Sequence, residues 1–239
     1  MKARLREIVF GRIHDALAGL VVKIFIGPFA DLTYSQEGED IVLSRLFANK
    51  KRGFYVDVGA HHPFRFSNTY KFYRLGWSGI NIDAMPGSMK AFEKYRSRDI
   101  NVEALISKEP KKLVFYSFNE PALNTVNREL AERRDGKDGY KIVKKYDLES
   151  KTLGDSLNRY LPEGVNIDFI SVDVESLDLE VLESNDWGRF VPEVVAVESL
   201  GTLESMDSLK NSPVYLFLTG KGYRLYSKLA NTLIFKINK

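Results

Sequence analysis

The sequence predicts an α/β protein that is built on a mostly parallel sheet with helices on both faces. Short apolar runs rich in Val, Ile and Phe alternate with segments of helical periodicity along most of the chain. Glycine and proline separate many of these segments. Continuous apolar runs are typical of strands buried on both faces, and their alternation with helices is typical of a parallel sheet.

Composition limits the classes of protein to which the chain can belong. Of 239 residues, 44% are hydrophobic and 28% are charged, which is typical of a folded domain with a sizeable core. Cysteine is absent, which excludes a disulfide framework, a cysteine nucleophile and thiolate-bound metal. The net charge is only +3 with both signs interspersed, so we expect no nucleic-acid partner.

The first 33 residues are predicted to form a helical segment separate from the domain over 34–239. An apolar stretch, 13–29, is interrupted by charged residues and ends at Gly27-Pro28. It is too short and too charged to span a membrane, and no signal-peptide cleavage pattern follows it. We expect a helix that packs on the domain or on a second subunit. The alternative is an amphipathic helix that lies in a membrane surface.

The first part of the domain contains three predicted strands with helices between them. Ser35 is a suitable N-cap for a helix that runs to about Asn49. A second helix runs from about 68 to 75 and stops at Gly76, and Pro86 opens a third over 87–98. The strands are predicted at 54–58, 79–83 and 100–106. We expect the aromatic residues Phe66, Tyr70 and Phe72 to pack in the core.

The middle of the domain is less regular. Two strands are predicted, at 112–118 and 140–146. The segment between them, 119–139, is rich in Arg, Lys, Asp and Glu. We interpret it as a solvated loop or a helical excursion, and the alternative is a lid that covers a substrate.

The alternation of helices and strands resumes in the last third of the chain. Helices are predicted at 152–161, where Pro162 follows, at 177–185 and at 213–219. Strands are predicted at 167–174, 193–198, 223–227 and 232–237.

The ends of the first two strands carry the residues that point to a ligand. In parallel sheets, ligands bind beyond the carboxyl ends of the strands, where the strand order reverses. Gly59 follows the first strand and permits a tight turn, but the next glycine is Gly76, so a dinucleotide fingerprint is absent. Asp57 is placed to face a cationic group, and Asp83 is placed to accept hydrogen bonds from ribose hydroxyls.

Asp57, Gly59 and Asp83 together favour a nucleoside that carries a positive charge and no phosphate. S-adenosylmethionine matches this description. The third predicted strand carries Glu103 and Ala104, where an adenine would be read. A nicotinamide-dependent oxidoreductase is the alternative, which the single glycine disfavours.

Several short motifs occur in one order between Tyr34 and Ile237. They are Tyr34-Ser-Gln-Glu-Gly-Glu-Asp40, Phe54-Tyr-Val-Asp-Val-Gly-Ala-His61, Ser67-Asn-Thr69, Leu75-Gly-Trp-Ser-Gly79, Asp168-Phe-Ile-Ser-Val-Asp-Val-Glu175, Gly222-Tyr223 and Asn231-Thr-Leu-Ile-Phe235. As an ordered set they resemble the FkbM family of S-adenosylmethionine-dependent methyltransferases. The resemblance implies a Rossmann-like class I fold with a seven-stranded sheet and an antiparallel last strand. It also implies O-methylation, often of sugars in polysaccharide or natural-product pathways.

The resemblance also implies roles for individual residues. Asp57, Gly59 and Ala60 would line the methionine end of the cofactor, Asp83 would bind the ribose, and Glu103 with Ala104 would lie near the adenine. Ser35, Gln36, Asn68 and Thr69 would surround the cofactor mouth, and Asp173 with Glu175 would face the methyl group and the acceptor. The chain departs from the family pattern at Ser176, where glycine is common, at Asp83, where glutamate is common, and at His61-His62-Pro63, where a glycine is frequent.

The acidic residues near the later strands suggest how the acceptor is activated. A sugar hydroxyl is a poor nucleophile, so a general base or a metal ion should assist. Asp173, Glu175 and Glu198 follow or end neighbouring predicted strands, and clustered carboxylates disfavour one another's charge. Either one carboxyl has a raised pKa and acts as base, or Mg²⁺ or Mn²⁺ bridges them. One of His61 and His62 is a further candidate for a base or ligand, and the other is structural.

The sequence therefore predicts an S-adenosylmethionine-dependent O-methyltransferase. Its expected acceptor is carbohydrate-like: a polysaccharide, a nucleotide sugar or a glycosylated natural product. The alternatives are an NAD(P)-binding oxidoreductase and a non-catalytic adapter of an envelope-polysaccharide assembly complex. We expect a cytoplasmic location, peripheral to the inner face of the membrane if residues 1–30 bind there. The sequence leaves open whether the chain forms a homo-oligomer.

Overall fold

The computed structural model describes residues 29–199 and 205–238. The domain begins at Tyr34. The predicted N-terminal helix falls on residues outside the described ranges. Within those ranges, no helix combines the length and the apolar character needed to cross a membrane.

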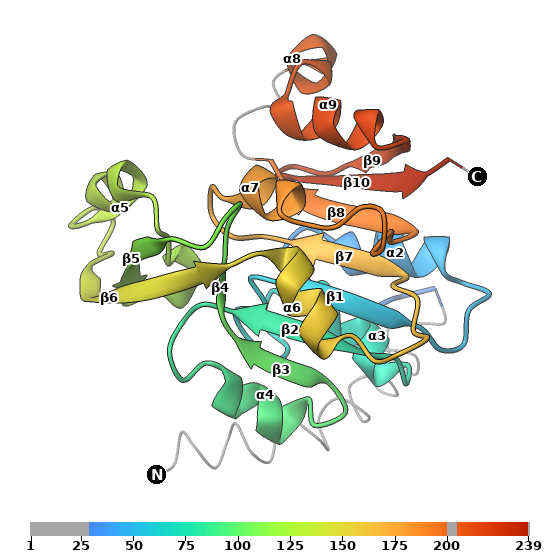
Figure 1. Ribbon diagram of the computed structural model, residues 1–239, viewed down its shortest axis with the longest axis horizontal. Coiled ribbons are helices and arrows are strands. Elements are labelled where there is room, and N and C mark those ends of the chain that lie inside the picture. Colours follow the sequence, from blue (N-terminus) through green and yellow to red (C-terminus); the bar gives the residue numbers. More distant parts are fainter. Residues whose placement is uncertain (1–28, 200–204, 239) are drawn as a thin grey trace. The chain divides into compact units, whose positions relative to one another are not determined.

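A seven-stranded sheet forms the centre of the domain (Figure 1), in the order β3-β2-β1-β7-β8-β10-β9. Its strands are β1 (Phe54–Val58), β2 (Ser78–Asp83), β3 (Ile100–Glu103), β7 (Phe169–Val172), β8 (Val194–Glu198), β9 (Tyr223–Lys228) and β10 (Thr232–Ile237). The first five are parallel, and β10 is antiparallel to both of its neighbours. This confirms the predicted sheet with an antiparallel last strand. The strand order reverses between β1 and β7, so the carboxyl ends of these strands lie at the switch point.

Helices cover both faces of this sheet, as predicted. They are α2 (Glu39–Leu46), α3 (Tyr70–Arg74), α4 (Met89–Tyr95), α6 (Leu153–Tyr160), α7 (Asp178–Glu183), α8 (Met206–Lys210) and α9 (Pro213–Gly220). One apolar cluster joins Val56 and Val58 of β1 to helices α6, α7, α8 and α9. A second cluster joins Tyr55 to α2 and α3. Alternate residues of a strand point to opposite faces, so these clusters lie on the two sides of the sheet.

A buried cation ties β1 and β2 to the helix layer. Arg96 directly follows α4 and is 0% exposed. Its guanidinium donates hydrogen bonds to Asp99 Oδ2 (2.8 Å), Tyr55 Oη (2.7 Å) and Asn81 Oδ1 (3.2 Å). It also donates to Thr69 Oγ1 (3.0 Å) and to the carbonyl oxygen of the loop residue 63 (3.0 Å). Pairing with Asp99 and full hydrogen bonding offset the cost of burying this charge.

Several predicted elements differ from the structure near their ends, and the strand predicted at 140–146 is Ile142–Lys151. The first helix begins at Glu39 rather than at Ser35, because Ser35 Oγ bonds to the Asp40 carboxylate and Gly38 occupies the N-cap. The predicted strand over 100–106 is two strands, β3 and β4 (Leu105–Ile106). The chain leaves the large sheet after β3, and β4 pairs with another strand instead.

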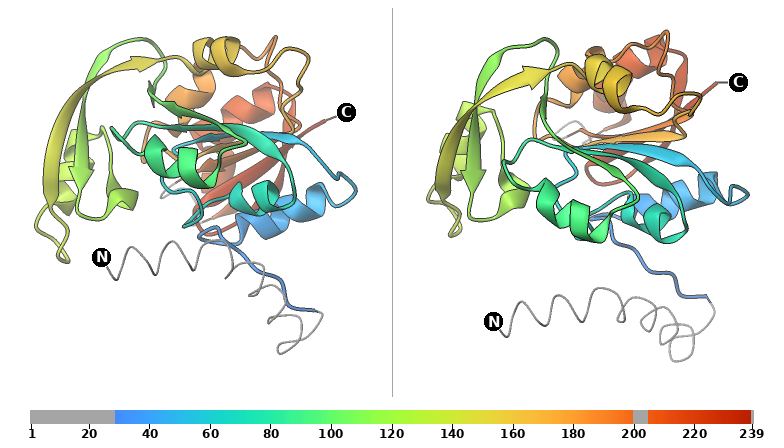
Figure 2. Two further views of the ribbon diagram at one scale, coloured as in Figure 1. Left: turned by 90° about the horizontal axis from the view of Figure 1, so that it is seen from below. Right: turned by 60° about the horizontal axis from the view of Figure 1, so that its bottom comes forward.

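A three-stranded sheet, β4-β6-β5, leads away from the large one. Its long strands are β5 (Lys112–Phe118) and β6 (Ile142–Lys151), which extend to one side of the domain in both views of Figure 2. The segment 119–139 connects them and contains the 3-10 turn η2 (Pro121–Leu123) and helix α5 (Arg128–Arg134). The segment is therefore a helical excursion, which was one of the two sequence-based interpretations.

Candidate functional site

A cavity of about 700 Å³ lies at the carboxyl ends of β1, β2, β7 and β8. Its lining includes Gly59, Asp83, Asp173 and Glu198, which follow or end those four strands. The volume is within the range of small-molecule sites. The position is the one at which a ligand was expected, because the strand order reverses there.

The turn after β1 explains the glycine at position 59. Gly59 has a φ of 85°, and a Cβ atom there would lie 1.7 Å from the carbonyl oxygen of Asp173. The amides of Gly59 and Ala60 both donate to the carbonyl oxygen of Ile82 (2.9 and 3.0 Å). Only glycine lets the turn pack this closely against the chain after β7.

Asp83 is fixed at the cavity by backbone groups. Its Oδ2 accepts a hydrogen bond from the amide of His61 (2.9 Å), and its Oδ1 accepts one from the amide of Met85 (2.8 Å). Burial raises the pKa of this carboxyl. Each carboxylate oxygen has a further acceptor position. The arrangement therefore presents an oriented acceptor to a ligand in the cavity.

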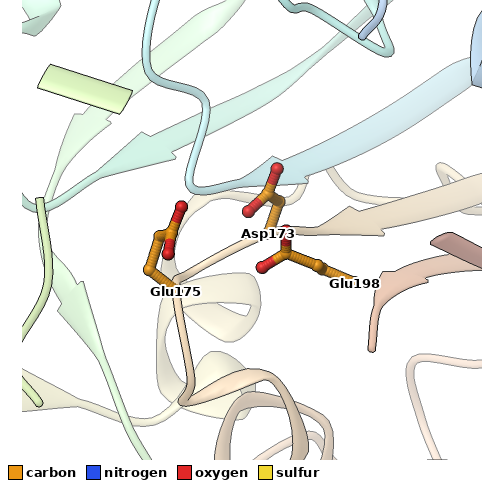
Figure 3. Close-up of side chains that lie close together, drawn as sticks. All are labelled: Asp173, Glu175 and Glu198. Carbon is orange, nitrogen blue, oxygen red and sulfur yellow. The ribbon is translucent and has the colours of Figure 1, made fainter. Parts of the chain in front are cut away.

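Three carboxyl groups meet on the other side of the cavity (Figure 3). One oxygen from each of Asp173, Glu175 and Glu198 lies within 4.8 Å of the other two. Glu198 Oε2 is buried and has no hydrogen-bond partner among the described residues. Enclosure by protein atoms and the nearby negative charges raise the pKa values of Asp173 and Glu198. Burial raises the pKa of Glu175, and the charge of Arg134 opposes that rise.

Asp178 shapes the chain beneath this carboxyl cluster. It accepts hydrogen bonds from the amides of Val174 (3.1 Å) and Ser176 (3.2 Å), and burial raises its pKa to about 7. Asp178 belongs to none of the motifs that predicted the site from the sequence. The available signal was an acidic side chain at the first position of a helix, where a carboxylate caps free amides.

Backbone strain is concentrated around the cavity. His61, Phe66 and Glu175 line it and have φ values of 52°, 56° and 52°, and Ser176 follows with a φ of 95°. Residues other than glycine rarely adopt these φ values, and residues that do so tend to cluster at functional sites. Phe66 is 41% exposed, with the guanidinium of Arg65 4.3 Å from its ring centre. The prediction that Phe66 packs in the core is therefore wrong.

The segment 119–139 forms one wall of the cavity. Residues 120–126 and Arg134 are in the lining. Arg65 donates two hydrogen bonds to the Glu120 carboxylate (2.9 and 3.2 Å), and Arg134 donates one to Glu175 Oε2 (2.8 Å). The excursion thus forms part of the cavity wall, and its role as a lid over a substrate stays a prediction.

The two adjacent histidines differ in environment. Nδ1 of His62 accepts hydrogen bonds from the amides of Phe64 (3.3 Å) and Arg65 (3.1 Å), which gives His62 a structural role. The Nε2 atom of His61 is buried without a partner among the described residues. Burial lowers the pKa of His61 to about 4, so this imidazole is neutral at pH 7.

The cavity brings together only part of the predicted site. All predicted catalytic and metal-binding residues line it: His61, Asp173, Glu175 and Glu198. Of the predicted cofactor residues, those in the lining are Gln36, Gly59, Asp83, Ala104 and Asp173. The others lie outside the lining: Ser35, Asp57, Ala60, Asn68, Thr69 and Glu103.

The residues outside the lining support its wall. Thr69 Oγ1 donates to Asp57 Oδ2 (2.7 Å) on the face of β1 that Arg96 occupies. Asn68 Nδ2 donates to Ser171 Oγ (3.0 Å), and the amide of Gly87 donates to Glu103 (2.6 Å). Their predicted contacts with a cofactor stay predictions.

Comparison with known proteins gives one family. The model of the methyltransferase FkbM domain matches residues 57–225. None of the curated proteins matches the chain. Among solved structures, the chain is similar to a methyltransferase from Geobacter sulfurreducens (TM-score 0.43, 10% identity, 99% of this chain and 96% of that chain covered). It is also similar to precorrin-6y C5,15-methyltransferase from Geobacter metallireducens GS-15 (TM-score 0.44, 12% identity, 84% and 87% covered).

Asp57 makes the stability of the domain depend on pH. Burial raises its pKa to about 6, against about 3.9 in an unfolded chain. Between these values the folded state holds a proton that the unfolded state has released, so stability falls as the pH rises and the loss is complete above pH 6. The unfolding free energy of Asp57→Asn, taken relative to that of the wild type, should therefore be about 3 kcal/mol higher at pH 7 than at pH 4. Urea denaturation across this range measures the difference.

The matched control is Asp147→Asn, because Asp147 is exposed on β6. Its difference from the wild type should not change with pH. A constant difference for Asp57→Asn as well would contradict a raised pKa.

Proposed function

The chain belongs to the methyltransferase FkbM family, and from this premise we propose that it is an O-methyltransferase acting on a hydroxyl of a carbohydrate-like acceptor. As a member of this family it is a methyltransferase that uses S-adenosylmethionine. Three inferences are ours: the oxygen nucleophile, the class of acceptor and the residues assigned below.

The residues around Asp83 suit S-adenosylmethionine. The carboxylate of Asp83 would accept hydrogen bonds from the ribose hydroxyls, because its own backbone donors hold it at the cavity. Ala104, Leu105 and Met85 offer an apolar surface for the adenine. When bound, the cofactor supplies a methyl group on a sulfonium. Gly59 and Asp173 are assigned to the methionine end of the cofactor, and Asp173 is also a member of the carboxyl cluster.

The observation that carries the proposal is that one cavity contains both Asp83 and the carboxyl cluster. A hydroxyl nucleophile must lose its proton, and an adjacent carboxylate is a suitable acceptor for it. Burial and mutual repulsion raise the pKa values of Asp173 and Glu198, which strengthens the ionised member of the pair as a base. Gln36, Asn124 and Asn231 add amide groups that suit a polyhydroxyl acceptor.

His61 is assigned to a neutral hydrogen-bonding role at this site. Its imidazole lines the cavity, but a pKa of about 4 makes it a weak base at pH 7. The carboxyl cluster is therefore the better source of the base. The cytoplasmic location, the membrane contact through residues 1–30 and the oligomeric state remain predictions.

A divalent cation is the second part of the proposal. Asp173, Glu175 and Glu198 place three oxygen donors within 4.8 Å of one another, and Glu198 Oε2 is buried without a partner among the described residues. Oxygen donors are the ligands that Mg²⁺ and Mn²⁺ prefer. A cation held there would offset the clustered negative charge and polarise the acceptor oxygen. Without it, one of the carboxyls carries a proton.

Substitution of Asp83 tests the cofactor assignment. Asp83→Ala should weaken binding of S-adenosylhomocysteine by about 1.5–3 kcal/mol, which is the contribution of hydrogen bonds to a charged group. Isothermal titration calorimetry measures this change. The control is Glu93→Ala, because Glu93 is exposed on α4. Equal affinity for the Asp83 variant and the wild type would remove Asp83 from the cofactor site.

Methyl transfer from labelled S-adenosylmethionine tests the acceptor class. Polysaccharides, nucleotide sugars and glycosylated small molecules would be compared with amine, carbon and RNA acceptors. We expect an alkali-stable methyl ether on a sugar, and a fall in turnover of about 10²- to 10⁴-fold for Glu198→Gln. Label found only on nitrogen or carbon would contradict the proposed reaction.

Removal of metal tests the cation. We expect the purified enzyme to lose activity in excess chelator and to regain it with Mg²⁺ or Mn²⁺, with plasma mass spectrometry of the untreated protein as the measure of bound metal. Full activity in excess chelator would show that a shared proton, not a cation, balances the carboxyl cluster.

A further inference from the structure

Glu175 occupies a conformation that its own strand does not impose. It lies beyond the end of β7, and both it and Ser176 have positive φ values of 52° and 95°. Residues other than glycine keep such values only when neighbouring groups hold them there. The groups that bond to Glu175 come from the segment 119–139, about fifty residues earlier in the chain.

Thr125 holds the backbone of Glu175. Its hydroxyl donates to the carbonyl oxygen of Glu175 (2.9 Å) and accepts from the amide of Asn127 (3.0 Å). Thr125 also exchanges two backbone hydrogen bonds with Tyr116 of β5 (2.8 and 3.2 Å) and is 1% exposed. One buried residue therefore connects the small sheet, through its backbone, to the strained residue, through its hydroxyl.

Arg134 holds the side chain of Glu175. Its guanidinium donates to Glu175 Oε2 (2.8 Å) and to the carbonyl oxygen of Leu123 (3.2 Å). Both side chains are largely buried, with 21% and 17% exposed. The contact with Leu123 fixes the guanidinium, and the guanidinium orients the carboxylate towards the cluster in Figure 3.

We propose that Thr125 and Arg134 are positioning residues for methyl transfer, which act by holding Glu175 in the carboxyl cluster. The inference rests on the proposed function, in which Glu175 faces the acceptor. The same segment supplies Glu120, Leu123 and Asn124 to the cavity wall. The segment that lines this part of the cavity therefore also holds one member of the carboxyl cluster.

The cofactor side does not depend on these contacts. The backbone amides that bond to Asp83 belong to His61 and Met85, which lie outside the segment 119–139. Loss of either positioning residue should therefore lower the rate of transfer and leave cofactor binding unchanged. A general structural role would weaken both together.

The test compares matched substitutions in the full-length protein. Thr125→Val removes the hydroxyl and keeps the shape, whereas Thr125→Ser keeps the hydroxyl. Arg134→Met removes the guanidinium, and Arg133→Met is its control, because Arg133 is an exposed neighbour on α5. We expect kcat to fall about tenfold or more for Thr125→Val and Arg134→Met, because small misplacements of a reacting group are costly.

The controls and the binding data decide the outcome. Thr125→Ser and Arg133→Met should retain the wild-type kcat, and the Kd for S-adenosylhomocysteine should stay within about twofold for every variant. Equal kcat values for Thr125→Val and Thr125→Ser would overturn the role of Thr125. A loss of cofactor affinity that parallels the loss of kcat would overturn the positioning role of both residues.

A crystal structure of Thr125→Val with S-adenosylhomocysteine decides the point without an acceptor. We expect Glu175 to leave the left-handed region and its carboxylate to leave the cluster. If Glu175 keeps its positive φ and its place beside Asp173, the proposal is overturned. If the wild type methylates no sugar, the proposed function fails, and this structure still tests the positioning role.

Discussion

The buried guanidinium of Arg96 donates hydrogen bonds to the polar side chains that lie beneath the turns of the site. It bonds to Tyr55 of β1, to Asn81 of β2 and to Thr69, and Thr69 in turn bonds to Asp57. A buried cation that loses its partners is costly, so these strands are held in one relation to each other. The turns that carry Gly59 and Asp83 follow directly from those two strands. The position of the cavity therefore depends on the charge of Arg96, although Arg96 is not in the cavity lining.

A second constraint is the close approach of the chain after β1 to the chain after β7. The missing side chain of Gly59 lets its turn rest on the Asp173 carbonyl. This contact holds the backbone of Asp173, a member of the carboxyl cluster, against the turn that follows β1. Asp178 then holds the amides of Val174 and Ser176, so the cluster is supported from below. Backbone amides fix the carboxylates of Asp83 and Asp178, and Arg134 fixes that of Glu175, despite the mutual repulsion of the acidic groups.

Motifs that are far apart in the sequence meet in the structure. Glu37 accepts hydrogen bonds from the amide and the side chain of Asn231, although 194 residues separate them. Glu39 accepts one from Thr232 (2.9 Å). These contacts fix the segment before α2 beside the turn into β10, where Gln36 and Asn231 reach the cavity. The motif at residues 34–40 thus acts mainly as a support for the wall, and only Gln36 of its seven residues is in the lining.

The sequence alone determined most strands and helices of the large sheet, its parallel character and the edge at which a ligand is expected, because apolar periodicity and strand-end residues are local signals. It also placed Asp83, Asp173, Glu175 and Glu198 at that edge. Only the tertiary structure separated the residues of the cavity from those behind it: Asp57 lies in β1, two residues before Gly59, but its side chain bonds to Thr69 and is not in the cavity lining. Only the tertiary structure brought the polar segment 119–139 onto Glu175, because no sequence pattern of Thr125 or Arg134 identifies a partner that lies 50 or 41 residues away. Contacts between distant parts of a chain are set by tertiary packing, and the spacing of residues in the sequence does not predict that packing.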